Sequence, residues 1–125
     1  ELKEISYIHA EGYAGGELKH GPIALIDRHT PVISLVDESE LKEKMLSNME
    51  EIKARHGILL GVGNKNNSTL KDICNYVIDC PSSPIATIQA IISVIPLQLF
   101  AYYVALHRGT DVDQPRNLAK SVTVE

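Results

Sequence analysis

The stretch PVISLVDESELKEKMLSNMEEIKARHGILLGV, residues 31–62, decides the fold. It opens on an apolar run, residues 31–36, and it closes on a second one, residues 58–62. Short apolar runs that are bounded by turn residues are typical of strands buried on both faces of a sheet. A segment of helical length separates the two runs, so the stretch predicts two parallel strands joined by a right-handed helical crossover.

The segment between these strands has the pattern of an amphipathic helix. The acidic run at residues 37–40 suits a helix N-terminus, where the partial positive charge of the backbone favours carboxylates. Apolar residues then recur at helical spacing, namely Leu41, Met45, Leu46, Met49 and Ile52. His56 and Gly57 close the pattern, because glycine readily adopts the left-handed conformation that ends helices. We therefore expect one helix that opens at Asp37 and ends at His56.

The alternation of helices and strands continues on both sides of this unit. The further elements that we expect are a helix near residues 2–8, a short helical segment over 17–26, a helical turn at 69–74, a third strand at 76–78 and an apolar helix over about 83–107 with a kink at Pro96. This order predicts an α/β fold, a three-layer α/β/α sandwich around a parallel, flavodoxin-like sheet. Such folds open on a strand, so we expect the first strand to precede Glu1.

We expect one domain over residues 1–107 and a C-terminal tail over residues 108–125. A chain of 125 residues, 44% hydrophobic and 22% charged, has the size and composition of one globular domain. The tail lacks an amphipathic period, but its apolar residues Leu118, Val122 and Val124 lead us to expect that it packs against another surface.

Composition and charge also exclude several classes of protein. The net charge of −4 argues against nucleic acid as the main partner. Gln89, Pro96 and Gln98 interrupt the longest apolar run, so we expect no membrane-spanning helix and no membrane partner. The chain has no basic segment followed by an apolar one, so we expect no signal peptide and a cytoplasmic protein.

The two cysteines, Cys74 and Cys80, have no histidine or cysteine neighbours at metal-binding spacing. We interpret them as buried thiols that flank a short strand, with a disulfide or a catalytic thiol as the alternatives. Gly61 and Gly63 lack the third glycine of a dinucleotide-binding loop. We therefore expect neither a metal nor a cofactor.

Three residues are candidates for proton or carbonyl chemistry, and each also has a structural interpretation. Glu4 lies on the polar side of the first predicted helix, as a solvated charge or as a general base. His20 lies in AGGELKHGPIALID, residues 14–27, where glycines and Pro22 constrain the backbone of a structural or a proton-transferring histidine. Lys120 lies in the tail, either in a frayed terminus or as a nucleophile toward a carbonyl.

Two long motifs, LKEISYIHAEGYAGGELKHGPIALID at residues 2–27 and GTDVDQPRNLAKSVTVE at residues 109–125, resemble the C-terminal sugar isomerase (SIS) domain of the glucosamine-6-phosphate synthases. The resemblance is close at both ends and loose over about residues 36–83. Enzymes of this family convert fructose 6-phosphate and glutamine-derived ammonia to glucosamine 6-phosphate without a cofactor. The resemblance implies a sugar phosphate substrate, upstream SIS and glutaminase domains in the same protein, and a homodimer.

The resemblance also implies site residues. Glu4 would move a proton between C1 and C2 of the sugar imine, His20 would assist ring opening across the dimer interface, and Lys120 would form an imine with the open-chain ketose. The family's phosphate-binding loop belongs to the preceding SIS domain, so we assign no substrate-binding residue here and expect this chain alone to be inactive. Ser82 and Ser83 are expected to cap the last helix, with anion binding as the alternative. Glu1 stands where the family has a second lysine.

A second function is open at this point. The chain is either the catalytic part of such an isomerase or a non-catalytic SIS module that binds a phosphosugar as a sensor or a dimerisation unit. A binding module has no need of a glutamate, a histidine and a lysine together. The presence of all three residues favours the catalytic interpretation.

Overall fold

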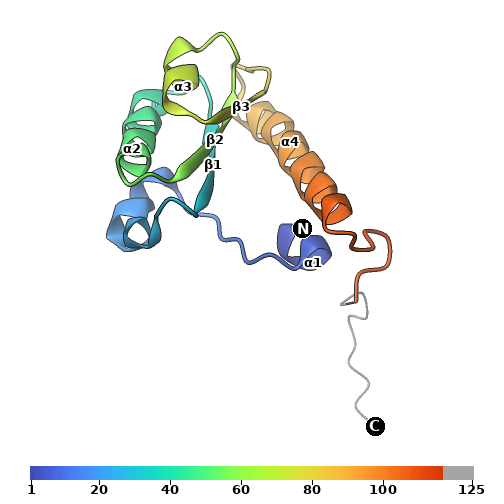
Figure 1. The fold of residues 1–125 in the computed structure, drawn as a ribbon. Coiled ribbons are helices and arrows are strands. Elements are labelled where there is room, and N and C mark those ends of the chain that lie inside the picture. Colours follow the sequence, from blue (N-terminus) through green and yellow to red (C-terminus); the bar gives the residue numbers. More distant parts are fainter. Residues whose placement is uncertain (117–125) are drawn as a thin grey trace. The chain divides into compact units, whose positions relative to one another are not determined.

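The computed structural model describes residues 1–116 of the 125-residue chain. The chain splits into two compact units, Tyr13–Pro96 and a second unit made of Glu1–Gly12 with Leu97–Glu125. The elements, labelled in Figure 1, are α1 (Leu2–Ser6), the 3₁₀ helices η1 (Gly15–His20) and η2 (Pro22–Leu25), β1 (Pro31–Val36), α2 (Lys42–Ala54), β2 (Ile58–Gly63), α3 (Ser68–Ile73), β3 (Tyr76–Asp79) and α4 (Ala86–His107).

The first unit contains a sheet with the strand order β1-β2-β3. Both strand pairs are parallel, with Pro31 opposite Ile58 and Leu60 opposite Tyr76 at the start of each pairing. The predicted α/β class with a parallel sheet is therefore confirmed, and each predicted strand is present within one residue of its expected end.

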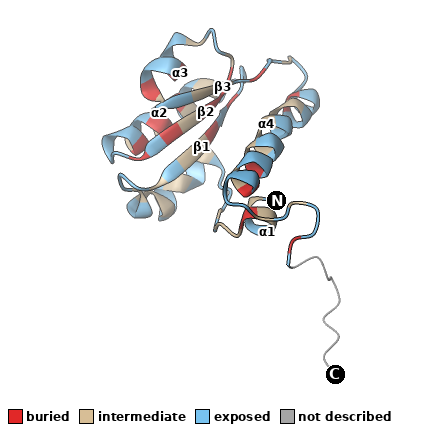
Figure 2. Cartoon of the chain, turned by 45° about the vertical axis from the view of Figure 1, so that its right-hand side comes forward, coloured by how far each residue is buried: buried red, intermediate tan, exposed pale blue. Residues whose placement is uncertain are grey.

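The core lies on one face of this sheet, between the strands and the helices α2 and α3. Figure 2 shows buried positions along the strands and on α2 and α3, in red. The core residues are Val36, Leu46, Met49, Ile52, Leu59, Leu70 and Ile73. Burial of each large apolar side chain stabilises the fold by about 1.5–3 kcal/mol. The opposite face is more open, since Leu35, Ile58 and Tyr76 are exposed. Burial on both faces was therefore predicted wrongly for Leu35 and Ile58.

Helix α2 begins at Lys42, five residues later than predicted. The Asp37 carboxylate accepts the Ser39 N–H at 3.1 Å, and the Ser39 hydroxyl accepts the Leu41 N–H at 3.3 Å. These local bonds offer the backbone a turn in place of a helix. The acidic run therefore forms the turn that leads into the helix.

The segment over residues 17–26 forms two 3₁₀ helices rather than one helix. Gly21 separates η1 from η2 with φ 144°, in the region that disfavours residues with a side chain. Pro22 then opens η2, where a residue without an N–H is tolerated.

Helix α4 begins at Ala86 rather than at Ser83, and it continues through Pro96. The Ser83 N–H donates to Gln89 Oε1 at 2.7 Å, and its hydroxyl accepts the Ile85 N–H at 3.2 Å. The Gln89 N–H donates to the Ile85 carbonyl at 2.9 Å, so the helical bonds start at Ile85. The prediction that Ser82 or Ser83 is the N-cap is therefore wrong, because Ser83 stabilises the turn before the helix.

By length and composition alone, α4 is long and apolar enough to cross a membrane. Gln89, Pro96 and Gln98 were expected to rule out a membrane-spanning helix, but they do not make α4 polar enough to fail this test. Core helices of soluble proteins pass the same test, so the result is weak evidence for a membrane span.

Both cysteines are free thiols, as predicted, with Cys80 buried and Cys74 partly buried. Burial raises the pKa of the Cys74 thiol, and the Gly61 backbone and the Lys53 ammonium partly oppose this effect. A raised pKa lowers the thiolate fraction at neutral pH, which disfavours a nucleophilic role.

Candidate functional site

Glu4 is presented by α1, a helix of five residues. So short a helix is not stable by itself, so it depends on contacts beyond its own backbone. Inside it, the Ser6 hydroxyl donates to the Leu2 carbonyl at 2.5 Å. Tyr7 ends the helix in the left-handed conformation, with φ 56°, and its N–H donates to the Lys3 carbonyl at 3.2 Å. The Glu4 side chain itself is exposed.

Three residues about a hundred positions away, Thr110, Arg116 and Gln98, hold α1 within its unit. The Thr110 hydroxyl donates to the Ile5 carbonyl at 2.7 Å, directly beside Glu4. The Arg116 N–H donates to the Tyr7 phenol oxygen at 3.0 Å, and the Arg116 guanidinium lies 4.0 Å from the centre of the Tyr7 ring. Gln98 donates to the Glu1 carboxylate at 3.3 Å. The fold thus fixes the backbone that carries Glu4 while it leaves the carboxylate accessible.

His20 is the last residue of η1 and is exposed. Its neighbour Lys19 forms an ion pair with Glu51 of α2 at 2.6 Å, and Leu18 packs against the core. Gly21 follows with its positive φ. The backbone that precedes His20 is therefore anchored to α2 and to the core, and Gly21 turns the chain directly after it.

The three predicted site residues fall in three different parts of the chain. Glu4 and His20 belong to different compact units, and each unit is described by itself. Lys120 lies outside the described residues, as do the tail residues Leu118, Val122 and Val124. Within residues 1–116, no group of three or more His, Cys, Asp or Glu side chains is placed to hold a metal ion.

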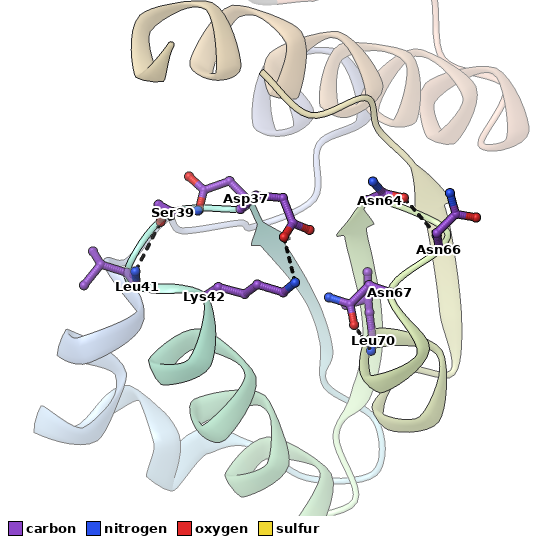
Figure 3. A network of polar contacts seen from close by, with 9 residues as sticks. Asp37, Ser39, Leu41, Lys42, Asn64, Asn66, Asn67 and Leu70 are labelled. Carbon is purple, nitrogen blue, oxygen red and sulfur yellow. Dashed lines mark hydrogen bonds and ion pairs between the residues drawn. The ribbon is translucent and has the colours of Figure 1, made fainter. Parts of the chain in front are cut away.

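A polar depression at the carboxyl ends of β1 and β2 was not predicted. It has a volume of about 400 Å³ and is lined by Glu38, Lys42, Asn64, Asn66, Asn67, Ser68 and Thr69. Figure 3 shows the polar contacts at this place, among them one between Asn64 and Asn66. Lys42 pairs with Glu38 at 2.7 Å, and Asn67 caps α3 by accepting the Leu70 N–H at 3.1 Å. The sequence contains a feature from which this depression could have been predicted: two polar runs, DESE and NKNNS, follow adjacent parallel strands.

Two aspartates outside the candidate site have lowered pKa values. The Lys65 N–H and the Lys65 ammonium, the latter 3.2 Å away, hold the pKa of the Asp79 carboxyl below its usual range. The N–H of His29 and the hydroxyl of Thr30 do the same for Asp27. Both aspartates stabilise turns through these bonds.

Comparison with known proteins identifies the family. The SIS domain family matches residues 1–108. The chain is 55% identical to "Glutamine--fructose-6-phosphate aminotransferase [isomerizing]" of Aquifex aeolicus and 54% identical to the protein of that name from Clostridium perfringens, in each case over 100% of this chain and 21% of the relative.

A solved structure agrees with these relatives. It is the "C-terminal domain of glucosamine-fructose-6-phosphate aminotransferase from Francisella tularensis", which is 45% identical and matches with a TM-score of 0.79 over 91% of this chain and 32% of that one. This chain thus spans about a fifth of the length of the two aminotransferases. Since the family match covers most of the chain and the sheet is the parallel one that the fold requires, the chain belongs to the SIS domain family.

Proposed function

We propose that this chain is the sugar isomerase portion of a glutamine–fructose-6-phosphate aminotransferase, which converts fructose 6-phosphate and glutamine-derived ammonia to glucosamine 6-phosphate. One observation carries the proposal: the chain is 55% identical over its whole length to an enzyme of this name. The exposed Glu4 carboxylate on its anchored helix supports it further. The proposal assigns glutamine hydrolysis and phosphate binding to other domains of the same protein.

Each candidate residue has one step in this reaction. His20 assists opening of the sugar ring. The Lys120 amine then adds to the C2 carbonyl of the open-chain ketose, water leaves, and an imine remains. Ammonia replaces the lysine amine at C2, and Glu4 then moves a proton from C1 to C2 while the C1 hydroxyl proton passes to the imine nitrogen, which gives the 2-amino aldose. A positioned acid–base group of this kind accelerates a reaction by about 10²–10⁴-fold.

The complete enzyme would be a cytoplasmic homodimer in which His20 of one protomer acts at the site of the other. The exposure of His20 on an anchored backbone fits a group that is offered to a neighbouring molecule. The free thiols Cys74 and Cys80 fit a reducing compartment.

The substitution Glu4→Gln in the complete enzyme tests the proposed function. It keeps the size of the side chain but removes the group that accepts and returns the proton. We expect glucosamine 6-phosphate formation to fall at least about a hundredfold while glutamine hydrolysis continues. Because Glu4 is exposed, the free energy of unfolding should not change by more than about 0.5 kcal/mol.

The matched control is Glu50→Gln, which makes the same chemical change at an exposed position of α2. It should form product at the parent rate. A Glu4→Gln enzyme that also forms product at the parent rate would remove Glu4 from the mechanism and favour a module that only binds the sugar phosphate.

A further inference from the structure

One pair of residues joins the two segments that carry the candidate glutamate and the candidate lysine. Tyr7 follows Glu4 by three positions, and Arg116 precedes Lys120 by four. Two separate interactions connect the pair: the Arg116 N–H donates to the Tyr7 phenol oxygen at 3.0 Å, and the Arg116 guanidinium lies over the Tyr7 ring at 4.0 Å. The contact spans 109 positions of the chain.

The backbone of Tyr7 indicates that its side chain has a use. Tyr7 closes α1 with φ 56°, a conformation that is unfavourable for a residue with a β-carbon and that glycine adopts freely. A glycine at this position would end the helix with less strain. The tyrosine instead provides both the phenol oxygen and the ring face that hold Arg116.

The length of the chain determines what this contact does for Lys120. Four residues span at most about 14 Å, so a fixed Arg116 confines the Lys120 backbone to a sphere of that radius. If Thr110 were the last fixed residue, the ten residues that follow it would allow a radius of about 35 Å. The ratio of the two volumes is roughly fifteenfold, and a tether raises the effective concentration of the amine by a similar factor.

The second tie supports the same arrangement from the glutamate side. The Thr110 hydroxyl donates to the carbonyl of Ile5, the residue next to Glu4, and also to the carbonyl of Ala105 at 3.0 Å. The start of the C-terminal segment and its Arg116 are thus both fixed to the short helix that carries the candidate base.

We propose that Tyr7 and Arg116 are positioning residues that tether the lysine-bearing tail to the helix that carries Glu4, so that one sugar can meet both groups. The proposal rests on the proposed function, since it concerns the imine that Lys120 forms. Neither residue contacts the reacting atoms in this account. Their effect is on the rate at which the Lys120 amine reaches the ketose carbonyl.

The test measures how fast borohydride traps the fructose 6-phosphate imine on Lys120 in the complete enzyme. Tyr7→Leu removes both ties to the tail, and we expect about tenfold slower trapping and a kcat that falls in parallel. Arg116→Ala removes the guanidinium but keeps the backbone N–H that donates to Tyr7, so we expect a smaller loss of trapping rate. The KM for fructose 6-phosphate should change less than about twofold, because another domain binds the phosphate. The matched control is Arg108→Ala, an exposed arginine of the same unit, which should trap at the parent rate.

Further variants separate positioning from folding. Arg116→Lys keeps a cation over the ring and should restore most of the trapping rate. Tyr7→Phe keeps the ring but loses the phenol oxygen, and its trapping rate should lie between those of the parent and Tyr7→Leu. In a double-mutant cycle, Tyr7→Leu with Arg116→Ala should be no slower than the slower single variant, because both remove one tether.

Each remaining outcome counts against a defined claim. Parent-rate trapping by Arg116→Ala, or additive losses in the double variant, overturns the tether and leaves the proposed function intact. The tether is also overturned if the loss of trapping rate in each variant parallels its loss in the free energy of unfolding and Arg116→Lys does not restore the rate. That result would indicate a structural role alone. If the parent enzyme forms neither the adduct nor glucosamine 6-phosphate, the proposed function fails and the tether with it.

Discussion

The side chains of Glu4 and His20 are both exposed. The fold therefore does not bury either residue, and its contribution is to hold the backbone that carries each of them. The local sequence predicted this in part for His20, because Pro22 fixes its own φ and Gly21 can take the positive φ that the turn after His20 needs. The anchoring of Glu4 could not be predicted, since Thr110 and Arg116 reach α1 from the far end of the chain. The sequence therefore indicates candidate residues, and long-range contacts decide how they are held.

Asp79 gives a prediction about pH at the scale of a single residue. The Lys65 N–H and ammonium lower its pKa in the folded chain, so the ionised carboxylate stabilises the fold above the ordinary aspartate pKa of about 3.9. This stabilisation is lost as the pH falls through the lower, folded value. Asp79→Asn keeps an oxygen that can accept the Lys65 N–H but removes the charge.

We expect Asp79→Asn to lower the free energy of unfolding at neutral pH, and the difference from the parent chain to shrink as the pH falls below about 3.9. Urea denaturation of both chains at several pH values measures it. A difference that stays constant or grows on acidification would show that the Lys65 contact is not the source of the shift.

The strands were predictable because an apolar run between turn residues has few alternatives. The starts of α2 and α4 were harder to predict. The side chains of Asp37, Ser39 and Ser83 form hydrogen bonds to nearby backbone groups, and these bonds compete with the first helical turn. Composition predicts that an acidic or hydroxyl residue stands near a helix start. Geometry decides which residue caps it.

Gly63 gives a prediction at the scale of the sheet. A β-carbon added there would lie 2.6 Å from the Val36 carbonyl oxygen of the neighbouring strand, which cannot move without disturbing the pairing of β1 with β2. We expect Gly63→Ala to lower the free energy of unfolding by about 1–3 kcal/mol in urea denaturation.

Gly16→Ala is the control for Gly63→Ala. A β-carbon at Gly16 would meet no atom within 4 Å, and its backbone has no positive φ. We therefore expect Gly16→Ala to be at least as stable as the parent chain, since alanine also restricts the unfolded state. Equal losses in the two variants would mean that the close approach of β1 and β2 is not what requires glycine at Gly63.

At the scale of the whole molecule, the proposed active site combines residues of two protomers, and mixed dimers test this directly. Pairing a Glu4→Gln protomer with a His20→Asn protomer leaves one site with both substitutions and one site with neither, if His20 acts across the interface. The mixed dimer should then recover about half of the parent activity per dimer, although each homodimer is impaired at least about a hundredfold. If His20 acts within its own protomer, both sites stay impaired and mixing recovers nothing.

The central claim is that this SIS chain carries the amine that reacts with the ketose. Borohydride treatment of the complete enzyme in the presence of fructose 6-phosphate, followed by mass spectrometry of its peptides, tests it. The account predicts a sugar adduct on Lys120 that is absent from Lys120→Arg, because a guanidinium stays protonated and forms no imine. Lys120→Arg should also form glucosamine 6-phosphate at least about a hundredfold more slowly. An arginine variant that isomerises fructose 6-phosphate at the parent rate would contradict the account.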